Sequence, residues 1–225
     1  MDVVLVAGLW LDGSAWNEVV PVLEGLGHHP VAVTLPGQGD GSTAATLDDQ
    51  RDAVVAAVDA ADGPVVVVGH SAASTLAWMA ADARPDKVAG VALIGGFPSG
   101  DGDPYFREVD GEVLEFPGWE EFEGPDAADL GDAQRAEIES RMVPVPAAVV
   151  GGTVRLVDER RFDVPVSVIC PEFTPAQAAS WVDSGGVPEL ARARHVDYVD
   201  IDSGHWPMFS CPVELGHVLG RLGGT

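Results

Sequence analysis

Ser71 is the side chain of this sequence that is best placed for covalent chemistry. It lies within Gly69-His70-Ser71-Ala72-Ala73, after an apolar β-branched run that predicts a buried strand and before a helical pattern. A serine on a sharp turn between a strand and a helix projects its Oγ above the sheet edge, where a histidine can activate it for attack on a carbonyl carbon. Such a turn needs small neighbours because the strand and the helix nearly touch there, and Gly69 and Ala73 meet this requirement.

Candidate acids and a candidate base follow Ser71 in the chain. One apolar run leads into Pro171-Glu172-Phe173-Thr174-Pro175, and the last one leads into Asp202-Ser203-Gly204-His205-Trp206. The order serine, acid, histidine suits nucleophilic catalysis in which the histidine takes the serine proton. Each of these groups follows a predicted strand, so a parallel sheet would bring them to one edge.

The pattern of apolar residues indicates strands that alternate with helices. Short apolar runs predict strands at 3–7, 31–35, 65–69, 88–94, 164–170 and 196–201. Helical patterns cover 16–23, 46–62, 72–83 and 212–222. Pro21 interrupts the first, so regular helix would begin only near it, and an acidic capping box at Thr46 opens the second. This alternation predicts an α/β fold with a mainly parallel sheet flanked by helices, and ligands beyond the carboxyl ends of the strands.

Residues 98–162 interrupt this alternation. The segment has no clear strand, is rich in glycine, proline, acidic and aromatic residues, and is too long for a plain loop. Within it, 132–142 and 147–158 have helical patterns. We therefore predict a single domain over 1–225 in which a helical lid insertion, at about 98–162, covers the strand ends.

At four motifs the chain resembles the α/β-hydrolase superfamily, and most closely its compact esterases with a helical lid, including plant methylesterase and hydroxynitrile lyase relatives. The motifs are Ala7-Gly8-Leu9-Trp10 with Gly13-Ser14-Ala15-Trp16, Leu35-Pro36-Gly37-Gln38-Gly39, Gly69-His70-Ser71-Ala72-Ala73 and Gly204-His205-Trp206-Pro207. The resemblance covers essentially the whole chain. It implies that Ser71 is the nucleophile, that His205 is the general base, and that the backbone N–H groups of Leu9 and Ala72 form the oxyanion hole.

The chain departs from the family's pattern at the acid. The usual aspartate position after the fifth strand falls on Thr174, whose neutral hydroxyl cannot stabilise an imidazolium as a carboxylate does. Glu172 lies two residues earlier on the same loop, and we infer that it is the acid. The alternatives are Asp183, a carboxylate of the lid, or no acid at all. Two smaller departures are Ala7, where the family has a histidine, and Ala73, where it has a glycine.

Aromatic residues favour an apolar substrate. Those predicted to contact it are Trp10, Phe97, Trp119 and Trp206. Pockets for small molecules are mostly apolar with a few polar groups, so we expect a small or medium apolar ester, lactone or thioester. For any single aromatic residue, packing within the lid is an equally good interpretation.

The other histidines are interpreted as structural or surface residues. His28 and His29 are predicted at an exposed turn, and His195 at the surface where the last strand begins. His217 lies in the final predicted helix. His70 adjoins the nucleophile but points to the opposite side of the turn, so its role is predicted to be structural.

Composition excludes several classes of protein. The 225 residues carry a net charge of −24, with 36 acidic side chains against 12 basic ones, which disfavours nucleic acids and anionic membranes as partners. The two cysteines show no zinc spacing, and no dinucleotide or phosphate-binding glycine motif occurs. We therefore expect a small-molecule substrate and neither a metal nor a cofactor. The absence of a basic leader, of a cleavage site and of an apolar run near the roughly 20 residues of a membrane span predicts a cytoplasmic protein, as a monomer or homodimer.

Three functional hypotheses follow. The first is a cofactor-independent serine hydrolase, most simply a carboxylesterase. The second is a ligand sensor on the same fold with slow or absent turnover, which the threonine at the acid position keeps open. The third is a lyase or acyltransferase that uses the same pocket. A pocket lysine would favour a lyase, but Lys87, the one lysine of the chain, lies near the start of a predicted strand.

Overall fold

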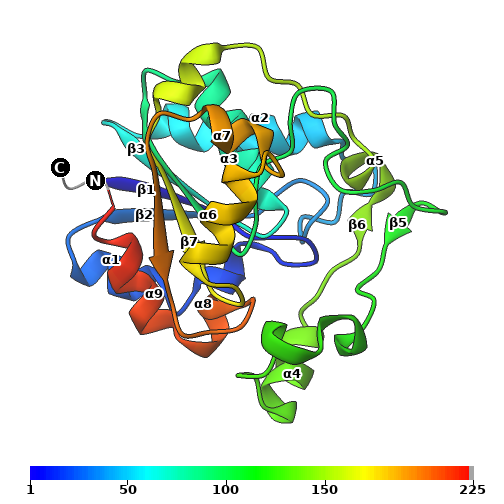
Figure 1. Cartoon of the computed structure of the whole chain (residues 1–225). Coiled ribbons are helices and arrows are strands. Elements are labelled where there is room, and N and C mark those ends of the chain that lie inside the picture. The colour runs from blue at the N-terminus through cyan, green and yellow to red at the C-terminus, as the bar shows by residue number, and fades with distance from the viewer. Residues whose placement is uncertain (223–225) are drawn as a thin grey trace.

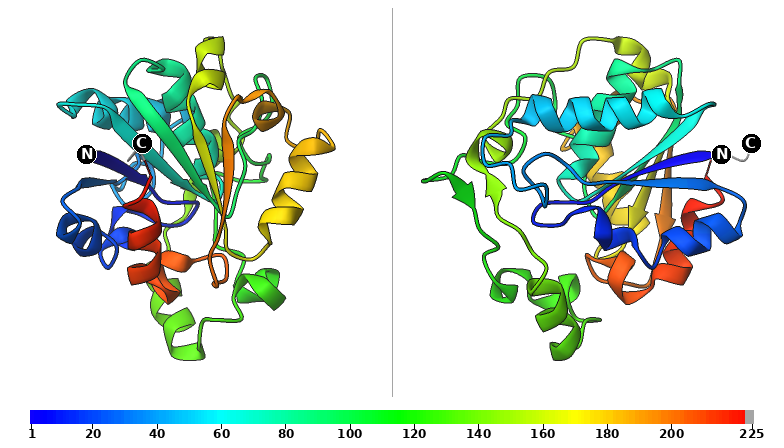
Figure 2. Two further views of the ribbon diagram at one scale, coloured as in Figure 1. Left: turned by 60° about the vertical axis from the view of Figure 1, so that its left-hand side comes forward. Right: turned by 180° about the vertical axis from the view of Figure 1, so that it is seen from behind.

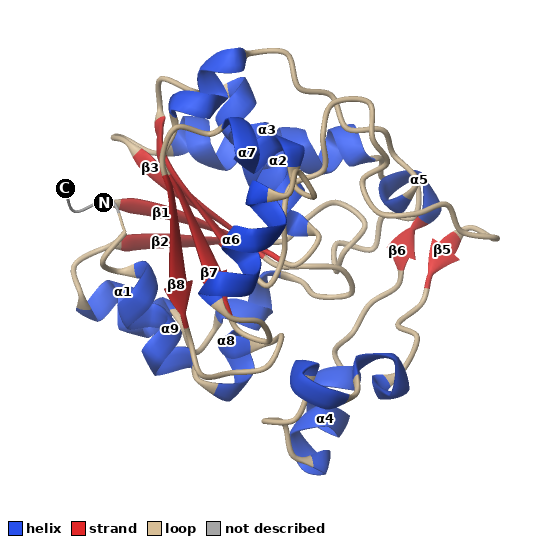
Figure 3. Cartoon of the chain, in the orientation of Figure 1, coloured by secondary structure: helices blue, strands red, loops and turns tan. Residues whose placement is uncertain are grey.

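A six-stranded, wholly parallel sheet forms the centre of the molecule (Figures 1 and 3). The computed structural model describes residues 1–222. The strands in spatial order are β2 (His29–Val33), β1 (Asp2–Val6), β3 (Val65–His70), β4 (Val88–Ile94), β7 (Val166–Cys170) and β8 (Val196–Asp200). This confirms the predicted α/β fold with a mainly parallel sheet, and each predicted strand lies within two residues of an observed one at either end.

Helices cover both faces of the sheet (Figure 2). One face packs against α2 (Leu47–Ala60), α3 (Ala73–Ala83) and α6 (Pro175–Asp183), and the other against α1 (Val20–Gly25) and α9 (Pro212–Leu219). Successive strand residues point to opposite faces, so Val4 joins the first core and Val3 and Leu5 join the second. A strand buried on both faces must be apolar throughout, which explains the unbroken valine run of β3.

The strand order reverses between β1 and β3. From β1 the chain passes to β2 on one side, whereas β3, β4, β7 and β8 follow in order on the other. In open parallel sheets the loops on the two sides of such a switch point diverge and leave a crevice at the carboxyl ends of the strands. The loop after β1 and the turn after β3 therefore lie side by side where a ligand is expected.

Helices α2 and α1 begin at or next to the residues that the sequence predicts. Thr46 and Asp49 form a reciprocal capping box at the start of α2, with Thr46 Oγ1 accepting a hydrogen bond from the Asp49 N–H. Pro21 occupies the first turn of α1, where a missing N–H costs nothing, and the 3-10 turn η1 (Gly13–Trp16) precedes it. Shorter elements complete the fold: α7 (Pro188–Arg192), α8 (Pro207–Ser210) and η4 (Glu159–Asp163).

The segment 98–162 contains short elements that pack beside the carboxyl ends of the strands (Figure 1). They are β5 (Val113–Leu114), η2 (Trp119–Phe122), η3 (Gly124–Asp126), α4 (Asp132–Glu139), β6 (Val145–Pro146) and α5 (Ala147–Val150). Contrary to the sequence prediction, β5 and β6 pair as a small antiparallel ribbon.

The predicted helix over 147–158 is wrong beyond Val150. Gly151 and Gly152 end it, since glycine is a poor helix former. The backbone of Gly152 also packs tightly on α2, where a methyl group would lie 2.5 Å from the Leu47 Cβ. Within residues 1–222 no helix is both long enough and apolar enough to cross a membrane.

A buried charge network joins the end of the 98–162 segment to helices α3 and α7. Arg161, only 4% exposed, donates to Glu189 at 2.9 Å and to Asp82 at 3.2 Å. Asp82 also accepts from the backbone N–H groups of Val157 and Asp158, at 2.9 and 2.8 Å. Removing one partner of a buried pair leaves an uncompensated charge, which costs far more than losing a surface pair.

We expect Arg161→Ala to lower the free energy of unfolding by about 3–5 kcal/mol, measured by urea denaturation, because Asp82 and Glu189 would stay buried without their cation. The matched control is the neighbouring Arg160→Ala. Arg160 pairs with Asp86 and Asp158 at the surface, so its removal is expected to cost under about 1 kcal/mol. Equal losses for the two variants would contradict this account of the network.

Candidate active site

Ser71 occupies a strained turn directly after β3. Its φ is +54°, a left-handed conformation that is uncommon for residues other than glycine and typical of strain held at functional sites. Its N–H donates to the Ile94 carbonyl at 2.8 Å, which fixes the turn to the end of β4. The strand and the helix approach so closely that a methyl group at Gly69 would collide with the Ala73 carbonyl. The elbow geometry expected from the sequence is therefore present.

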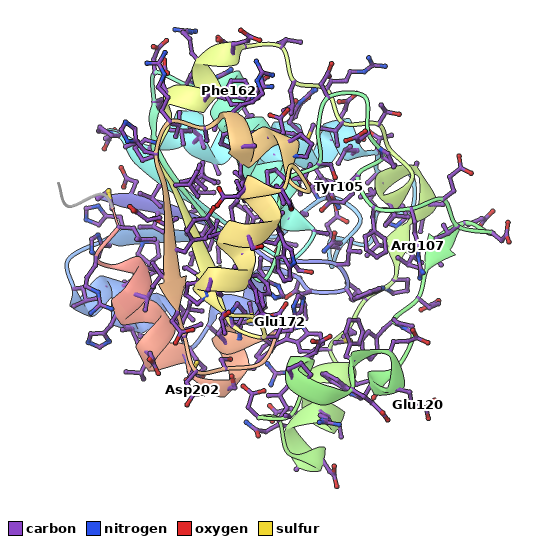
Figure 4. All side chains as sticks on the ribbon, in the orientation of Figure 1. Tyr105, Arg107, Glu120, Phe162, Glu172 and Asp202 are labelled. Atoms are coloured by element: carbon purple, nitrogen blue, oxygen red, sulfur yellow. The ribbon has the colours of Figure 1, made fainter. Side chains whose placement is uncertain are left out.

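Glu172 and His205 form a hydrogen bond at the same edge of the sheet. His205 Nδ1 lies 2.8 Å from Glu172 Oε1, and the two side chains are only 13% and 14% exposed. A carboxylate is an acceptor, so His205 Nδ1 carries the proton and Nε2 is left as the basic nitrogen. Figure 4 shows Glu172 just before the start of α6, at the end of the sheet to which the β8 arrow points.

Neither Thr174, at the family's usual acid position, nor the alternative Asp183 bonds to His205 among residues 1–222. Thr174 is exposed and caps α6, where its hydroxyl accepts from the Gln177 N–H at 3.2 Å. Asp183 is the last residue of α6 and is exposed. The helix rises about 1.5 Å per residue, so its far end is roughly 12 Å from its first turn beside Glu172.

Two glycines at the end of β4 lie between the serine and the histidine pair. A methyl group at Gly95 would lie 3.1 Å from His205 Nδ1 and 3.2 Å from Glu172 Oε2, and one at Gly96 would collide with the Ser71 backbone. The three predicted catalytic residues thus surround one short loop. Within residues 1–222 Ser71 Oγ makes no hydrogen bond to His205; such bonds are often long without substrate and tighten when it binds.

The loop after β1 lies beside Ser71. A methyl group at Gly8 would be 3.0 Å from the Ser71 Cβ. Leu9 follows in this loop and Ala72 follows the serine, and neither N–H donates a hydrogen bond within residues 1–222. Unpaired donors at both places are what an oxyanion hole requires.

Aromatic side chains form two groups around the site. The first, here called the His205 cluster, consists of Trp10, Phe116, Trp119, Phe122 and Trp206. In it Phe122 stacks on the His205 ring with centroids 6.5 Å apart, and Trp206 meets that ring edge-on at 4.9 Å.

The second aromatic group contains the remaining predicted pocket residue. Phe97 stacks on Phe173 at 5.6 Å and meets Trp181, which is 41% exposed on α6. The structure therefore brings together Trp10, Trp119 and Trp206, but places Phe97 in a separate group nearer the surface.

His70 is hydrogen-bonded to the loop that carries His205. Its Nε2 donates to the His205 carbonyl at 2.8 Å, and the side chain is 1% exposed. Burial, followed by the nearby charge of His205, lowers the pKa of His70 to about 3. This agrees with its interpretation as a structural residue, held neutral.

Two aspartates of the 98–162 segment hold the histidine loop. The Asp126 carbonyl accepts from the His205 N–H at 2.6 Å, and the Asp129 carboxylate accepts from the Gly204 N–H at 2.8 Å. Burial, and then the charge of Glu172, raises the pKa of Asp126. Sequence reasoning did not identify either residue, because nothing local marks where this segment packs back against the sheet.

The remaining histidines and cysteines lie outside the site. His29 and His195 are exposed, as predicted, and His217 lies in the final helix α9, also as predicted, with its side chain exposed. His28 is not; its ring is partly buried and lies 3.0 Å from the Gly220 carbonyl, because the turn before β2 packs on α9. Cys170 is fully buried, and burial raises the pKa of its thiol to about 12. Among residues 1–222, no group of three or more His, Cys, Asp or Glu side chains is arranged to hold a metal ion.

The buried neutral His70 predicts a pH-dependent stability. The unfolded state binds a proton at this residue below about pH 6.5, whereas the folded state does so only near pH 3. The stabilisation from His70 is therefore complete above about pH 6.5 and is lost as the pH falls, by up to about 1.4 kcal/mol per pH unit. We expect urea denaturation between pH 7 and 5 to show a steeper loss for the wild type than for His70→Gln, which keeps a donor but cannot titrate. Parallel losses would contradict this.

A family model described as the alpha/beta hydrolase family matches residues 3–216. The chain is similar in structure to an extracellular α/β-hydrolase from a Paenibacillus species, described as sharing structural and functional homology with tobacco salicylic acid binding protein 2. The two are 16% identical, each chain is covered to 100%, and the TM-score is 0.80.

The Arabidopsis methylesterase MES16 is also similar, with 17% identity, 98% of both chains covered and a TM-score of 0.75. A pyrethroid hydrolase from Sphingobium faniae JZ-2 is 20% identical, with 100% of this chain and 98% of the other covered and a TM-score of 0.70. No curated protein sequence matches the chain. The family match spans nearly all of the sequence, and the fold agrees with it throughout: the chain belongs to the alpha/beta hydrolase family.

Proposed function

We propose that this hydrolase is a cofactor-independent serine esterase that cleaves a small or medium apolar ester, lactone or thioester through an acyl-enzyme on Ser71. The observation that carries the proposal is the 2.8 Å bond from His205 Nδ1 to Glu172 Oε1, beside a serine held at a positive φ. That bond fixes the tautomer that leaves Nε2 able to accept the serine proton.

The reaction would proceed in two halves. Ser71 Oγ attacks the acyl carbon while its proton passes to His205 Nε2, and the N–H groups of Leu9 and Ala72 bind the developing oxyanion. Collapse of the tetrahedral intermediate breaks the ester bond, and the leaving alkoxide or thiolate takes the proton from His205. Water, deprotonated by His205, then attacks the acyl-enzyme and releases the carboxylic acid and free Ser71.

The surroundings of the site support an uncharged, apolar substrate. The His205 cluster places apolar rings around the histidine, and the Glu172 carboxylate beside it would repel an anionic acyl group. Two of the structural neighbours are named a methylesterase and a pyrethroid hydrolase, so the same fold carries ester chemistry elsewhere. We further propose that the 98–162 segment is the lid, since it contributes Phe122 over the His205 ring.

A lysine-assisted lyase receives no support. Lys87 immediately precedes β4, and its Nζ donates to the Asp59 carbonyl at the end of α2. This is the opposite end of β4 from the loop next to Ser71. The ligand-sensor and acyltransferase hypotheses are separated from the esterase by turnover and by product analysis.

The first test is hydrolysis of p-nitrophenyl acetate, butyrate and octanoate by the wild type and by Ser71→Ala. We expect steady turnover by the wild type and a loss of roughly a thousandfold or more in the variant, because the nucleophile is removed. The dependence on chain length measures the acyl pocket. Circular dichroism checks that both proteins are folded. A folded wild type without turnover would replace the esterase with the sensor hypothesis.

Glu172→Gln tests the acid. We expect kcat to fall by more than tenfold with an unchanged unfolding midpoint, because an amide cannot stabilise the imidazolium. The matched control is Thr174→Ala, which removes only the cap of α6 and is expected to cost about 1 kcal/mol of stability with kcat unchanged. Full activity in Glu172→Gln, or loss of activity in the control, would move the acid role away from Glu172.

A further inference from the structure

Two glutamine side chains are completely buried behind the loop that follows β1. Gln38 and Gln50 are both 0% exposed, although glutamine is mostly found at protein surfaces. A buried amide is costly unless it is hydrogen-bonded, and both polar atoms of Gln38 are paired, whereas Gln50 pairs its nitrogen and leaves Oε1 without a partner within residues 1–222. The partners of these two side chains therefore indicate what holds them there.

Gln38 uses both N–H bonds of its amide on the loop after β1. Its Nε2 donates to the Gly8 carbonyl at 2.9 Å and to the Leu11 carbonyl at 2.8 Å. These two carbonyls stand on either side of Leu9 and Trp10. One side chain thus fixes both ends of the stretch that carries the proposed oxyanion donor, the Leu9 N–H.

Gln50 determines which way the Gln38 amide faces. From α2, its Nε2 donates to Gln38 Oε1 at 3.1 Å and to the Pro36 carbonyl at 2.9 Å. Because Gln38 Oε1 accepts from Gln50, the nitrogen of Gln38 must face the loop. A reversed amide would direct an oxygen at the Gly8 and Leu11 carbonyls and lose all three bonds.

The loop needs this support because its backbone is strained. Trp10 has a φ of +66°, which a tryptophan rarely adopts. From the other side the 98–162 segment holds it: Val143 N–H donates to the Trp10 carbonyl at 2.9 Å, and the Trp10 indole donates to the Leu114 carbonyl at 3.2 Å. On the scaffold side the Gly13 N–H donates to Thr34 Oγ1 at 3.3 Å, and the glutamine pair supports the stretch from Gly8 to Leu11.

We propose that Gln38, oriented by Gln50, is a positioning residue for the oxyanion hole. It holds the Gly8 and Leu11 carbonyls so that the N–H of Leu9 faces the oxygen of the substrate bound at Ser71. Neither glutamine touches the substrate. The inference rests on the proposed esterase activity and adds to it the group that sets the direction of one oxyanion donor.

The mechanism predicts which kinetic constant changes. The oxyanion is absent from the bound substrate and develops in the transition state that leads to the tetrahedral intermediate, so a misdirected donor lowers kcat and leaves ground-state binding unchanged. Removing one donor from an oxyanion hole typically costs about 100- to 1,000-fold in kcat. Displacing rather than deleting it is expected to cost roughly 10- to 100-fold in Gln38→Met, with KM within about twofold.

Gln38→Glu provides a readout that general loss of packing would not give. An ionised carboxylate would direct oxygens at both carbonyls, whereas a protonated one can donate to one of them. A buried carboxyl titrates above its usual range. We therefore expect kcat of Gln38→Glu, relative to the wild type at each pH, to rise as the pH falls from 8 to 6. The same ratio for Gln38→Met is expected to stay flat.

Two further variants separate positioning from stability. Val58→Ala, at a fully buried position in α2 two turns after Gln50, destabilises the same helix without touching the loop and is expected to keep wild-type kcat. Gln50→Met leaves Gln38 in place but frees its amide to reverse, so a smaller fall in kcat than in Gln38→Met is expected. This milder variant also keeps the test available if Gln38→Met does not fold.

A p-nitrophenyl ester and a trifluoromethyl ketone that forms an oxyanion on Ser71 are the probes. For Gln38→Met we expect a fall in kcat and a matching fall in affinity for the ketone. The affinity for the carboxylic acid product is expected to stay unchanged. Wild-type kcat in all glutamine variants, or a rise in KM alone, would overturn the inference while Ser71-dependent turnover still stands. Absence of Ser71-dependent turnover in the wild type would overturn the proposed function itself, and this inference with it.

Discussion

The close approach of backbones at the carboxyl edge of the sheet is the constraint on which the rest of the structure depends. Parallel pairing brings the ends of β1, β3, β4, β7 and β8 to one edge, and their loops must then share a small space. Glycine makes this possible. Side chains at Gly8, Gly69 and Gly96 would collide with the elbow or press on it. A serine at positive φ persists there because the surrounding main chain leaves it no other conformation.

Within that edge, charge is arranged around one imidazole. Glu172 gives His205 a carboxylate partner, whereas His70, buried in contact with the same loop, is kept neutral, its pKa lowered by burial and by the charge of His205. A second cation at that place would oppose protonation of His205 during the reaction. The neutral His70 instead donates one hydrogen bond to the main chain of His205, which fixes the loop without competing for the proton.

Most of the fold was predictable because its signals are local. A strand buried on both faces must be apolar throughout, and the capping box at Thr46 involves residues three apart, so both can be read within a few positions. The glycine pair that ends α5 was an equally local signal, but the helical pattern was extended through it. The carboxylate that pairs with His205 was identifiable from its loop, since Glu172 and Thr174 differ in charge. The split of the aromatic residues was not predictable, because the separation of Phe97 from Trp10 depends on how the 98–162 segment returns to the sheet. Gln38 and Asp129 were missed for the same reason: the loop atoms that they bind, the Leu11 carbonyl and the Gly204 N–H, lie 27 and 75 residues away along the chain.

The 98–162 segment contacts both the His205 loop and the loop after β1. The Asp126 carbonyl and the Asp129 carboxylate hold the loop of His205, while Val143 and Leu114 hold Trp10 in the loop that carries the oxyanion donor. One segment therefore restrains both the His205 loop and the loop of Leu9. The core holds the same two loops through His70 and Gln38. Each loop is thus held twice, once by the core and once by the 98–162 segment.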